Sequence, residues 1–107
     1  MFTESSIMLP VAILARVEAK PGQEAAVEAF LKSALPLANA EPDTPVWFAL
    51  KIGPSTFGIF DAFPHAEGRT AHLNGPIAAA LMANAAELLS HPPTIEMVEV
   101  LASKMPQ

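Results

Sequence analysis

The chain has 107 residues, of which 51% are hydrophobic and 16% are charged, and its formal net charge is −5. This length suits a single domain over residues 1–107, with a core at about 11–104. An acidic chain offers no basic surface to nucleic acid or to anionic lipid, so we expect neither as a partner. Because the chain has no cysteine, we exclude disulfides, thiolate nucleophiles and cysteine-ligated metals and expect a cytoplasmic protein.

The first predicted element is a strand over Val11–Ala19, in which apolar residues alternate along the chain. We do not expect the apolar run Ile7–Ala15 to be a signal peptide, because Glu4 and no basic residue precedes it and Pro10 interrupts it. No segment approaches the length of a membrane span.

A helix follows the turn Lys20-Pro21-Gly22, since Pro21 is suited to an early helical position. Its apolar residues recur at helical spacing: Val27, Phe30, Leu31, Ala34 and Ala38. Pro36 should kink or end this helix near Leu35. The segment Asn39–Pro45, with two prolines and two acids, is predicted as a loop.

Two strands come next, over Val46–Ile52 and Thr56–Phe63. They are separated only by Gly53-Pro54-Ser55, a connection short enough for an antiparallel hairpin. Pro64 then opens a short helix that runs to about His72.

Asn74-Gly75-Pro76 is predicted as a break, because glycine can cap one helix and proline can start another. An alanine-rich helix over Ile77–Leu89 follows. The last strand is predicted at Thr94–Ala102, and Ser103–Gln107 forms a tail.

The predicted order β-α-β-β-α-β is a ferredoxin-like α+β fold with a four-stranded antiparallel sheet. Right-handed crossovers place both helices on one face of the sheet and leave the other face uncovered. We assign Trp47, Ala49 and Lys51 to the uncovered face, together with Leu14, and we assign Val46, Phe48, Leu50 and Ile52 to the helix-facing core. An uncovered apolar face predicts a homodimer formed by sheet-on-sheet packing, with Trp47 as a core or interface anchor.

Asp61 is the first candidate for chemistry, because it alternates with the apolar residues Phe57, Ile59 and Phe63. A carboxylate at the end of a buried row would have a raised pKa and could act as a general base. Two structural roles remain open for it: anchoring the start of the next helix, or pairing with Arg69.

The short helix supplies the other candidates, because His65, Arg69 and His72 lie at i, i+4 and i+7 on one face. If the protein is an oxygenase, a neutral His72 could take a phenolic proton while Arg69 steadies the resulting anion. The two histidines are about 10.5 Å apart along the helix axis, which is too far for one metal ion. In the next helix, Asn84 either lies at the edge of the apolar stripe or points into a cavity between helices and sheet.

Two motifs of the sequence are the turn Lys20-Pro21-Gly22 and the run from Asp61-x-Phe63 to His72. The first resembles the turn into the first helix, and the second the central signature, of the antibiotic-biosynthesis monooxygenase family of the dimeric α/β-barrel superfamily. The resemblance spans roughly Val11–Lys104. It implies a homodimer that oxidises a quinol or polycyclic phenol, a small aromatic substrate, with O₂ and no cofactor. It also implies catalytic roles for His72 and Asp61, and we expect substrate contacts from Phe63, Arg69 and Asn84.

The chain departs from that family pattern at two places. Phe63 stands where many members carry tryptophan, and the chain has no tyrosine to bond a phenolic substrate. A haem-degrading branch of the same fold calls for an asparagine on the first strand and a tryptophan at position 63, so we expect no haem. The alternative function is a non-catalytic dimeric small-molecule-binding or stress-related protein.

Overall fold

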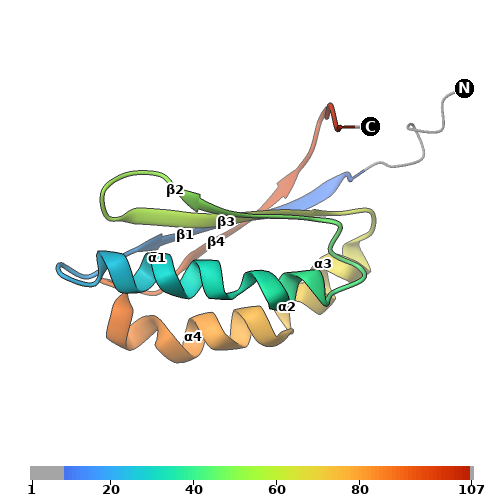
Figure 1. The fold of residues 1–107 in the computed structure, drawn as a ribbon. Helices are drawn as coiled ribbons and strands as arrows, with labels where there is room; N and C mark the ends of the chain where they lie inside the picture. The colour runs from blue at the N-terminus through green and yellow to red at the C-terminus, as the bar shows by residue number, and fades with distance from the viewer. Residues whose placement is uncertain (1–8, 107) are drawn as a thin grey trace, which may run out of the picture.

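The computed structural model describes residues 9–106, which form a four-stranded sheet with its helices on one side (Figure 1). The strands are β1 (Val11–Glu18), β2 (Val46–Lys51), β3 (Thr56–Phe63) and β4 (Thr94–Glu99). The helices are α1 (Glu24–Ser33), α2 (Leu35–Asn39), α3 (Ala66–Leu73) and α4 (Pro76–Leu88). Ile7 and Met8 of the apolar run, and Gln107 of the predicted tail, lie outside the described residues.

The strand order in the sheet is β2-β3-β1-β4, and all neighbouring strands are antiparallel. The helices α1 and α2 join β1 to β2, and α3 and α4 join β3 to β4. The predicted ferredoxin-like βαββαβ fold is therefore confirmed. In the part of the chain described here, no helix has both the length and the apolar character needed to cross a bilayer.

Proline ends the first helix as expected. Helix α1 stops at Ser33, Ala34 forms the joint, and Pro36 lies in the first turn of α2. Proline is tolerated there because the first turn has no intrahelical partner for its missing N–H. Gly22, in the turn before α1, has a φ of +88°, which side chains rarely adopt.

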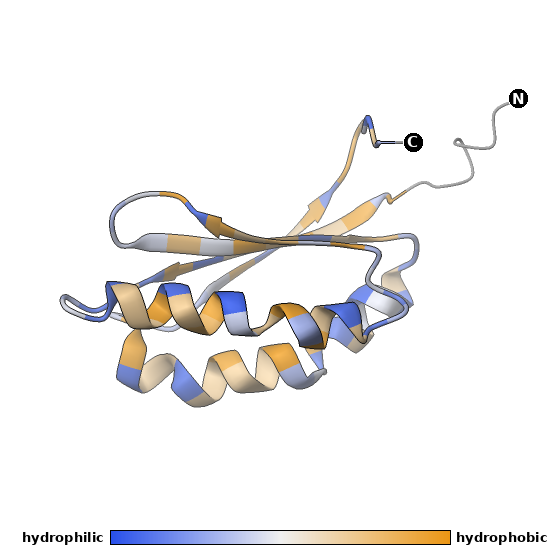
Figure 2. Cartoon of the chain, viewed as in Figure 1, coloured by the Kyte–Doolittle hydropathy of each residue, from blue (hydrophilic) through white to orange (hydrophobic). Residues whose placement is uncertain are grey.

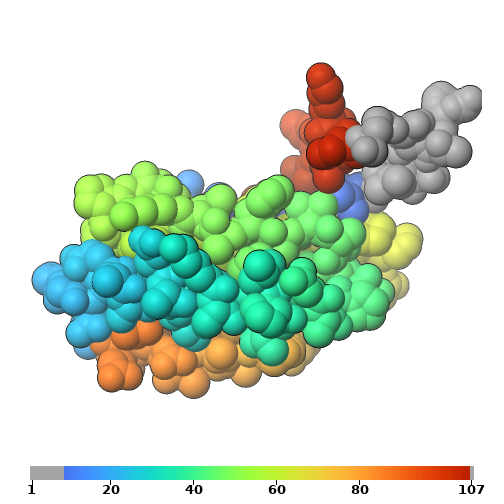
Figure 3. Space-filling view, viewed as in Figure 1, coloured from blue at the N-terminus to red at the C-terminus, as the bar shows by residue number. Residues whose placement is uncertain are grey.

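The last strand is shorter than predicted, because β4 ends at Glu99 and not at Ala102. Glu99 pairs with Val11 at the start of β1, and one further bond runs from the Val100 N–H to the Pro10 carbonyl at 2.9 Å. Pro10 has no N–H to continue the ladder. The chain after β4 extends away from the body of the molecule, and Leu101 is 94% exposed (Figure 3).

The main core lies between the helices and the sheet, and a smaller apolar cluster lies on the opposite face. Hydrophobic residues occur on strands and helices alike (Figure 2). Among the largest fully buried side chains are Phe57, Phe63 and Asp61 of β3. The row predicted from their alternation is therefore buried, and Asp61 belongs to it.

The two faces of β2 are the reverse of those predicted. Trp47 packs against the core beneath the helices, whereas Phe48 is 54% exposed on the other face. The register explains this, because Trp47 pairs with Asp61, whose side chain faces α3, and Phe48 pairs with Phe60. Both faces of β2 carry apolar residues, so alternation alone could not decide which face is covered.

The open face of the sheet nevertheless carries an apolar row, beside the ion pair of Arg16 and Glu96. Phe48, Phe60 and Leu14 lie side by side across β2, β3 and β1, and Val46 and Val98 pack near the same end. At the edge of the sheet, Ile52 is 46% exposed. This face supports the dimer argued below.

Candidate functional site

The candidate site is built around Asp61, which β3 holds on the helix-facing side of the sheet. Asp61 is 1% exposed and lies in one row with Trp47 of β2 and Ile13 of β1. A carboxylate at such a position needs strong partners, because burial of a charge without pairing is costly.

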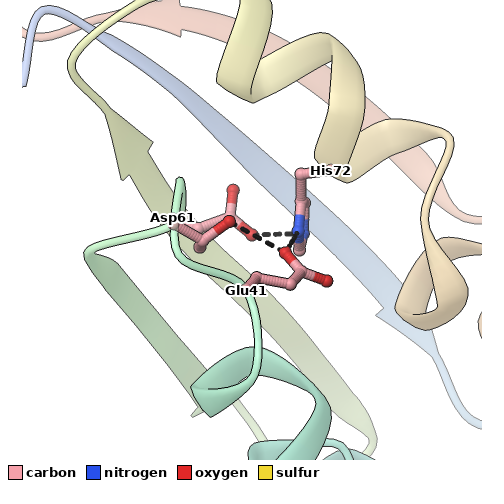
Figure 4. Close-up of polar contacts among 4 residues, drawn as sticks. Glu41, Asp61 and His72 are labelled. Carbon is pink, nitrogen blue, oxygen red and sulfur yellow. Dashed lines mark hydrogen bonds and ion pairs between the residues drawn. The ribbon is translucent and has the colours of Figure 1, made fainter.

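His72 of α3 supplies that partner and brings in a second carboxylate (Figure 4). Its Nε2 lies 2.8 Å from Asp61 Oδ2, and its Nδ1 lies 2.6 Å from Glu41 Oε1. Glu41 comes from the loop between α2 and β2, so the imidazole joins three segments that are distant in sequence. We call Glu41, Asp61 and His72 the acid–histidine cluster.

The charge of His72 follows from competing effects. Burial by itself lowers the pKa of His72, but the hydrogen bonds to Asp61 and Glu41, with the charges of both carboxylates, raise it to about 9. At neutral pH the imidazole is therefore a cation that donates from both ring nitrogens. This raised pKa, with both ring nitrogens against carboxylates, disfavours the neutral His72 that we expected to accept a proton.

Two carboxylate oxygens in the cluster have no partner. Thr44 Oγ1 donates to Glu41 Oε1 at 2.8 Å, so that oxygen receives two donors. Glu41 Oε2 and Asp61 Oδ1 are buried and have no hydrogen-bond partner within residues 9–106, and the same holds for Trp47 Nε1. Unsatisfied buried polar atoms are rare in folded proteins, and a catalytic role, local strain or a bound water is the usual reason for them.

An open hollow of about 320 Å³ adjoins the cluster. It is lined from one side by the α2–β2 loop and from the other by α3 and the start of α4, with Glu41, Thr44, His72 and Gly75 among the lining residues. A Cβ on Gly75 would lie 3.6 Å from Glu41 Oε2. The hollow is large enough for a small aromatic molecule, and Glu41 and His72 are the ionisable groups shared by the hollow and the cluster.

Arg69 and His65 do not join the cluster. Helix α3 begins at Ala66, so His65 precedes it and is exposed, and the predicted face of three residues does not form. The Arg69 guanidinium instead donates to the carbonyls of Ala12 and Val98, at 3.3 and 3.4 Å. The suggested Asp61–Arg69 pair is replaced by the Asp61–His72 pair.

Phe63 and Asn84 occupy different places relative to the cluster. Phe63 is fully buried, and its ring centroid lies 5.5 Å from that of His72, so it packs against the imidazole. Asn84 donates to the Ala80 carbonyl at 2.8 Å and lines a cavity of only about 10 Å³ between α1, α4 and β1. Such a cavity holds at most one water, so it is too small for the aromatic substrate that Asn84 was expected to contact there.

Glu41 could not be identified from the sequence, and Trp47 lies on the face of β2 opposite to the one predicted. Glu41 lies in a loop, where no periodicity connects it to β3 or α3. Its only signal is the pair of acids in Asn39–Pro45, which is also typical of a solvated loop. Among residues 9–106, no group of three or more histidine, aspartate or glutamate side chains is placed to hold a metal ion.

Solved structures of low sequence identity share the fold of this chain. A candidate antibiotic biosynthesis monooxygenase from Nitrosomonas europaea superposes with a TM-score of 0.75 at 14% identity, covering 86% of this chain and 99% of that chain. Rv0793 from Mycobacterium tuberculosis superposes with a TM-score of 0.77 at 21% identity, covering 90% and 99%. At these identities the likeness shows the fold alone. No protein-family model and no curated protein matches the chain.

A second Nitrosomonas europaea structure defines the family. NE2512, a protein of unknown function, is 69% identical to this chain, with a TM-score of 0.90 and coverage of 94% of this chain and 97% of that chain. The chain belongs to the family of NE2512.

Proposed function

We propose that the protein is a cofactor-free monooxygenase that oxidises a quinol or a polycyclic phenol with O₂. The main support is the buried His72 imidazolium, which lies between the carboxylates of Asp61 and Glu41 beside a hollow of about 320 Å³. Each carboxylate has one oxygen without a hydrogen-bond partner among residues 9–106. Fold neighbours described as candidate antibiotic biosynthesis monooxygenases support the same reaction class.

The cluster can take up a proton from a bound hydroxyl. With Glu41 and Asp61 ionised and His72 protonated, its net charge is −1, and one added proton makes it neutral. Glu41 lines the hollow, and its Oε2 is the oxygen that bonds to neither His72 nor Thr44. Oε2 accepts the proton in this proposal, while Oε1 keeps both of its donors. In this proposal His72 fixes and charges the carboxylates and does not itself accept the proton.

Deprotonation makes an electron-rich aromatic anion able to reduce O₂ directly. For a methylene between aromatic rings, R₂CH₂ and O₂ combine to a hydroperoxide, R₂CH–OOH, by one new C–O bond and transfer of one hydrogen. The hydroperoxide then breaks its O–O bond and releases water, leaving R₂C=O. The proton that Glu41 takes first is returned to the peroxide oxygen and completes the hydroperoxide. Glu41 then takes the remaining C–H proton and passes it to the departing hydroxide, so that R₂CH₂ and O₂ become R₂C=O and H₂O. Phe63, packed against His72, would keep the cluster dry.

The same proposal includes a homodimer formed through the open sheet face, and activity in the cytoplasm. The apolar row of Leu14, Phe48 and Phe60 supports the dimer, because monomers rarely expose large contiguous apolar patches. Roles for Arg69 and Asn84 in substrate binding remain predictions. Arg69 would have to exchange its two backbone hydrogen bonds, and Asn84 its one, for bonds to the substrate.

Oxygen-electrode measurements with a panel of quinols and anthrone-like phenols, under metal-free conditions, test the proposal. Glu41→Gln should lower turnover by about 10²–10⁴-fold, the usual contribution of general-base catalysis. Glu67→Gln makes the same chemical change at an exposed position of α3 and should leave turnover unchanged. If the folded wild-type protein consumes no oxygen with any member of the panel, the monooxygenase assignment fails.

One observation favours a second candidate, a non-catalytic small-molecule-binding or stress-related protein. Both ring nitrogens of His72 are committed to carboxylates, so the residue best suited to proton transfer at neutral pH has no free lone pair. Saturable binding of a panel phenol without oxygen uptake would support this candidate over the enzyme.

A further inference from the structure

Trp47 and Asp61 present a matched pair of unused polar atoms on the helix-facing side of the sheet. They lie directly opposite each other in the β2–β3 ladder, so their Cβ atoms are about 4.5–5.5 Å apart. The Trp47 indole nitrogen can only donate, and Asp61 Oδ1, as a carboxylate oxygen, can only accept. Within residues 9–106 neither atom has a hydrogen-bond partner, although both are buried, and they do not bond to each other.

A hydroxyl group is the chemistry that satisfies both atoms at once. Its oxygen accepts from the indole N–H, and its hydrogen is donated to Asp61 Oδ1. A carbonyl could serve only the indole, and an ammonium could serve only the carboxylate. Asp61 Oδ1 cannot turn away to find another donor without breaking the bond from Oδ2 to His72, which is 2.8 Å long.

We propose that Trp47 Nε1 and Asp61 Oδ1 form a binding site for a single hydroxyl group, carried by water in the free protein or by a hydroxylated aromatic ligand. The ligand form rests on the proposed function, whereas the hydroxyl site itself does not. Trp47 thereby becomes a specificity residue, since its N–H distinguishes a phenol from the corresponding hydrocarbon. This hydroxyl site uses the carboxylate of Asp61, whereas the carboxylate of Glu41 lines the hollow. His72 bonds to both carboxylates and so links the two positions.

The decisive test replaces the Trp47 indole by benzothiophene, which keeps the ring shape and lacks the N–H. If a hydroxyl bridges the two atoms, the replacement removes one of its bonds, and the thermal midpoint should fall by about 4–8 °C, the shift that a lost hydrogen bond gives in a domain of this size. If nothing is bound, the replacement removes an unsatisfied buried donor, and the midpoint should stay or rise. An unchanged or higher midpoint overturns the proposal.

Ligand arms distinguish the source of the hydroxyl. Trp47 is the only tryptophan of the chain, so its emission reports directly on this site. If the ligand supplies the hydroxyl, phenol should change the emission and raise the midpoint, anisole should bind at least about 5-fold more weakly, and the benzothiophene protein should lose the preference for phenol. If phenol and anisole behave alike while the replacement still lowers the midpoint, water is the occupant. Neither arm requires O₂ or turnover, so a failure here is separate from a failure of the monooxygenase assignment.

Discussion

At His72, burial and charge act in opposite directions on one imidazole. Desolvation disfavours the cation, whereas Asp61 and Glu41 bind it through both ring nitrogens at 2.8 and 2.6 Å. The two carboxylates outweigh burial because each adds a charge-assisted hydrogen bond in a site largely closed to water. His72 is therefore a cross-link between α3, β3 and the α2–β2 loop as much as a candidate for chemistry.

The free energy of unfolding should fall as the pH rises from about 6.5 to about 9. The pKa of His72 is about 9 in the folded protein, against 6.5 for an ordinary histidine. Between these values the folded state binds more protons than the unfolded chain, so a rise in pH favours unfolding. The contribution of His72 is complete below about 6.5 and is lost through about 9.

Urea unfolding at half-unit pH steps measures this dependence, and His72→Gln is the control that removes the titrating group. The variant should be less stable than the wild type at pH 6, by about 3–5 kcal/mol, because two buried carboxylates lose their cation. Its stability should also change less between pH 6.5 and 9. Parallel pH profiles for the two proteins would contradict the assignment of the charge to His72.

At the scale of elements, close backbone approach fixes the centre of the sheet. Gly58 of β3 lies beside Arg16 of β1, and a Cβ built on Gly58 would lie only 2.7 Å from the Ala15 carbonyl oxygen. Backbone atoms of a central strand cannot move aside as a flexible side chain can. The glycine is therefore required by packing of β3 against β1.

Gly58→Ala should destabilise the fold by about 1–3 kcal/mol, the usual cost of forcing extra volume into a packed site. Gly53→Ala is the matched control, because the nearest atom to its added Cβ is 4.0 Å away. Chemical denaturation of both variants gives the comparison. Equal stabilities would show that the strands can separate enough to admit a methyl group.

At the scale of the whole molecule, the sheet has helices on one side and apolar residues on both. Phe48 and Ile52 are about half exposed on the open face of the monomer. Burial of such side chains contributes about 25 cal/mol per Å² of apolar surface, which makes pairing of two open faces favourable. Trp47 is not part of this surface, since it packs beneath the helices.

Phe48→Glu should convert a dimer of about twice 11.3 kDa into a monomer at low micromolar concentration. A charge on the open face opposes its burial against a second copy. Met82→Glu is the control, because Met82 is 59% exposed on α4 and lies on the helix layer. Light scattering measures the mass. A wild-type protein that is already monomeric would exclude the dimer.

Much of the fold could be predicted from the sequence, because it depends on local signals. Alternation along β3 identified the buried row that contains Asp61, and Pro36 marked the end of α1. Glycine and proline at positions 74–76 marked the break between α3 and α4. These signals act over a few residues through backbone sterics and side-chain periodicity, and so they are visible in the chain itself.

The tertiary structure alone decided the faces of β2 and the partners of His72. Strand register turned Trp47 inward and Phe48 outward, and both faces were apolar enough to suit either arrangement. Glu41 reaches His72 of α3 across 31 residues, and Asp61 reaches it from β3. The sequence by itself therefore determined which elements form and that one sheet face stays open. Chain packing decided the charge of His72 and the identity of its neighbours, because electrostatic contacts depend on distance in space and not on spacing along the chain.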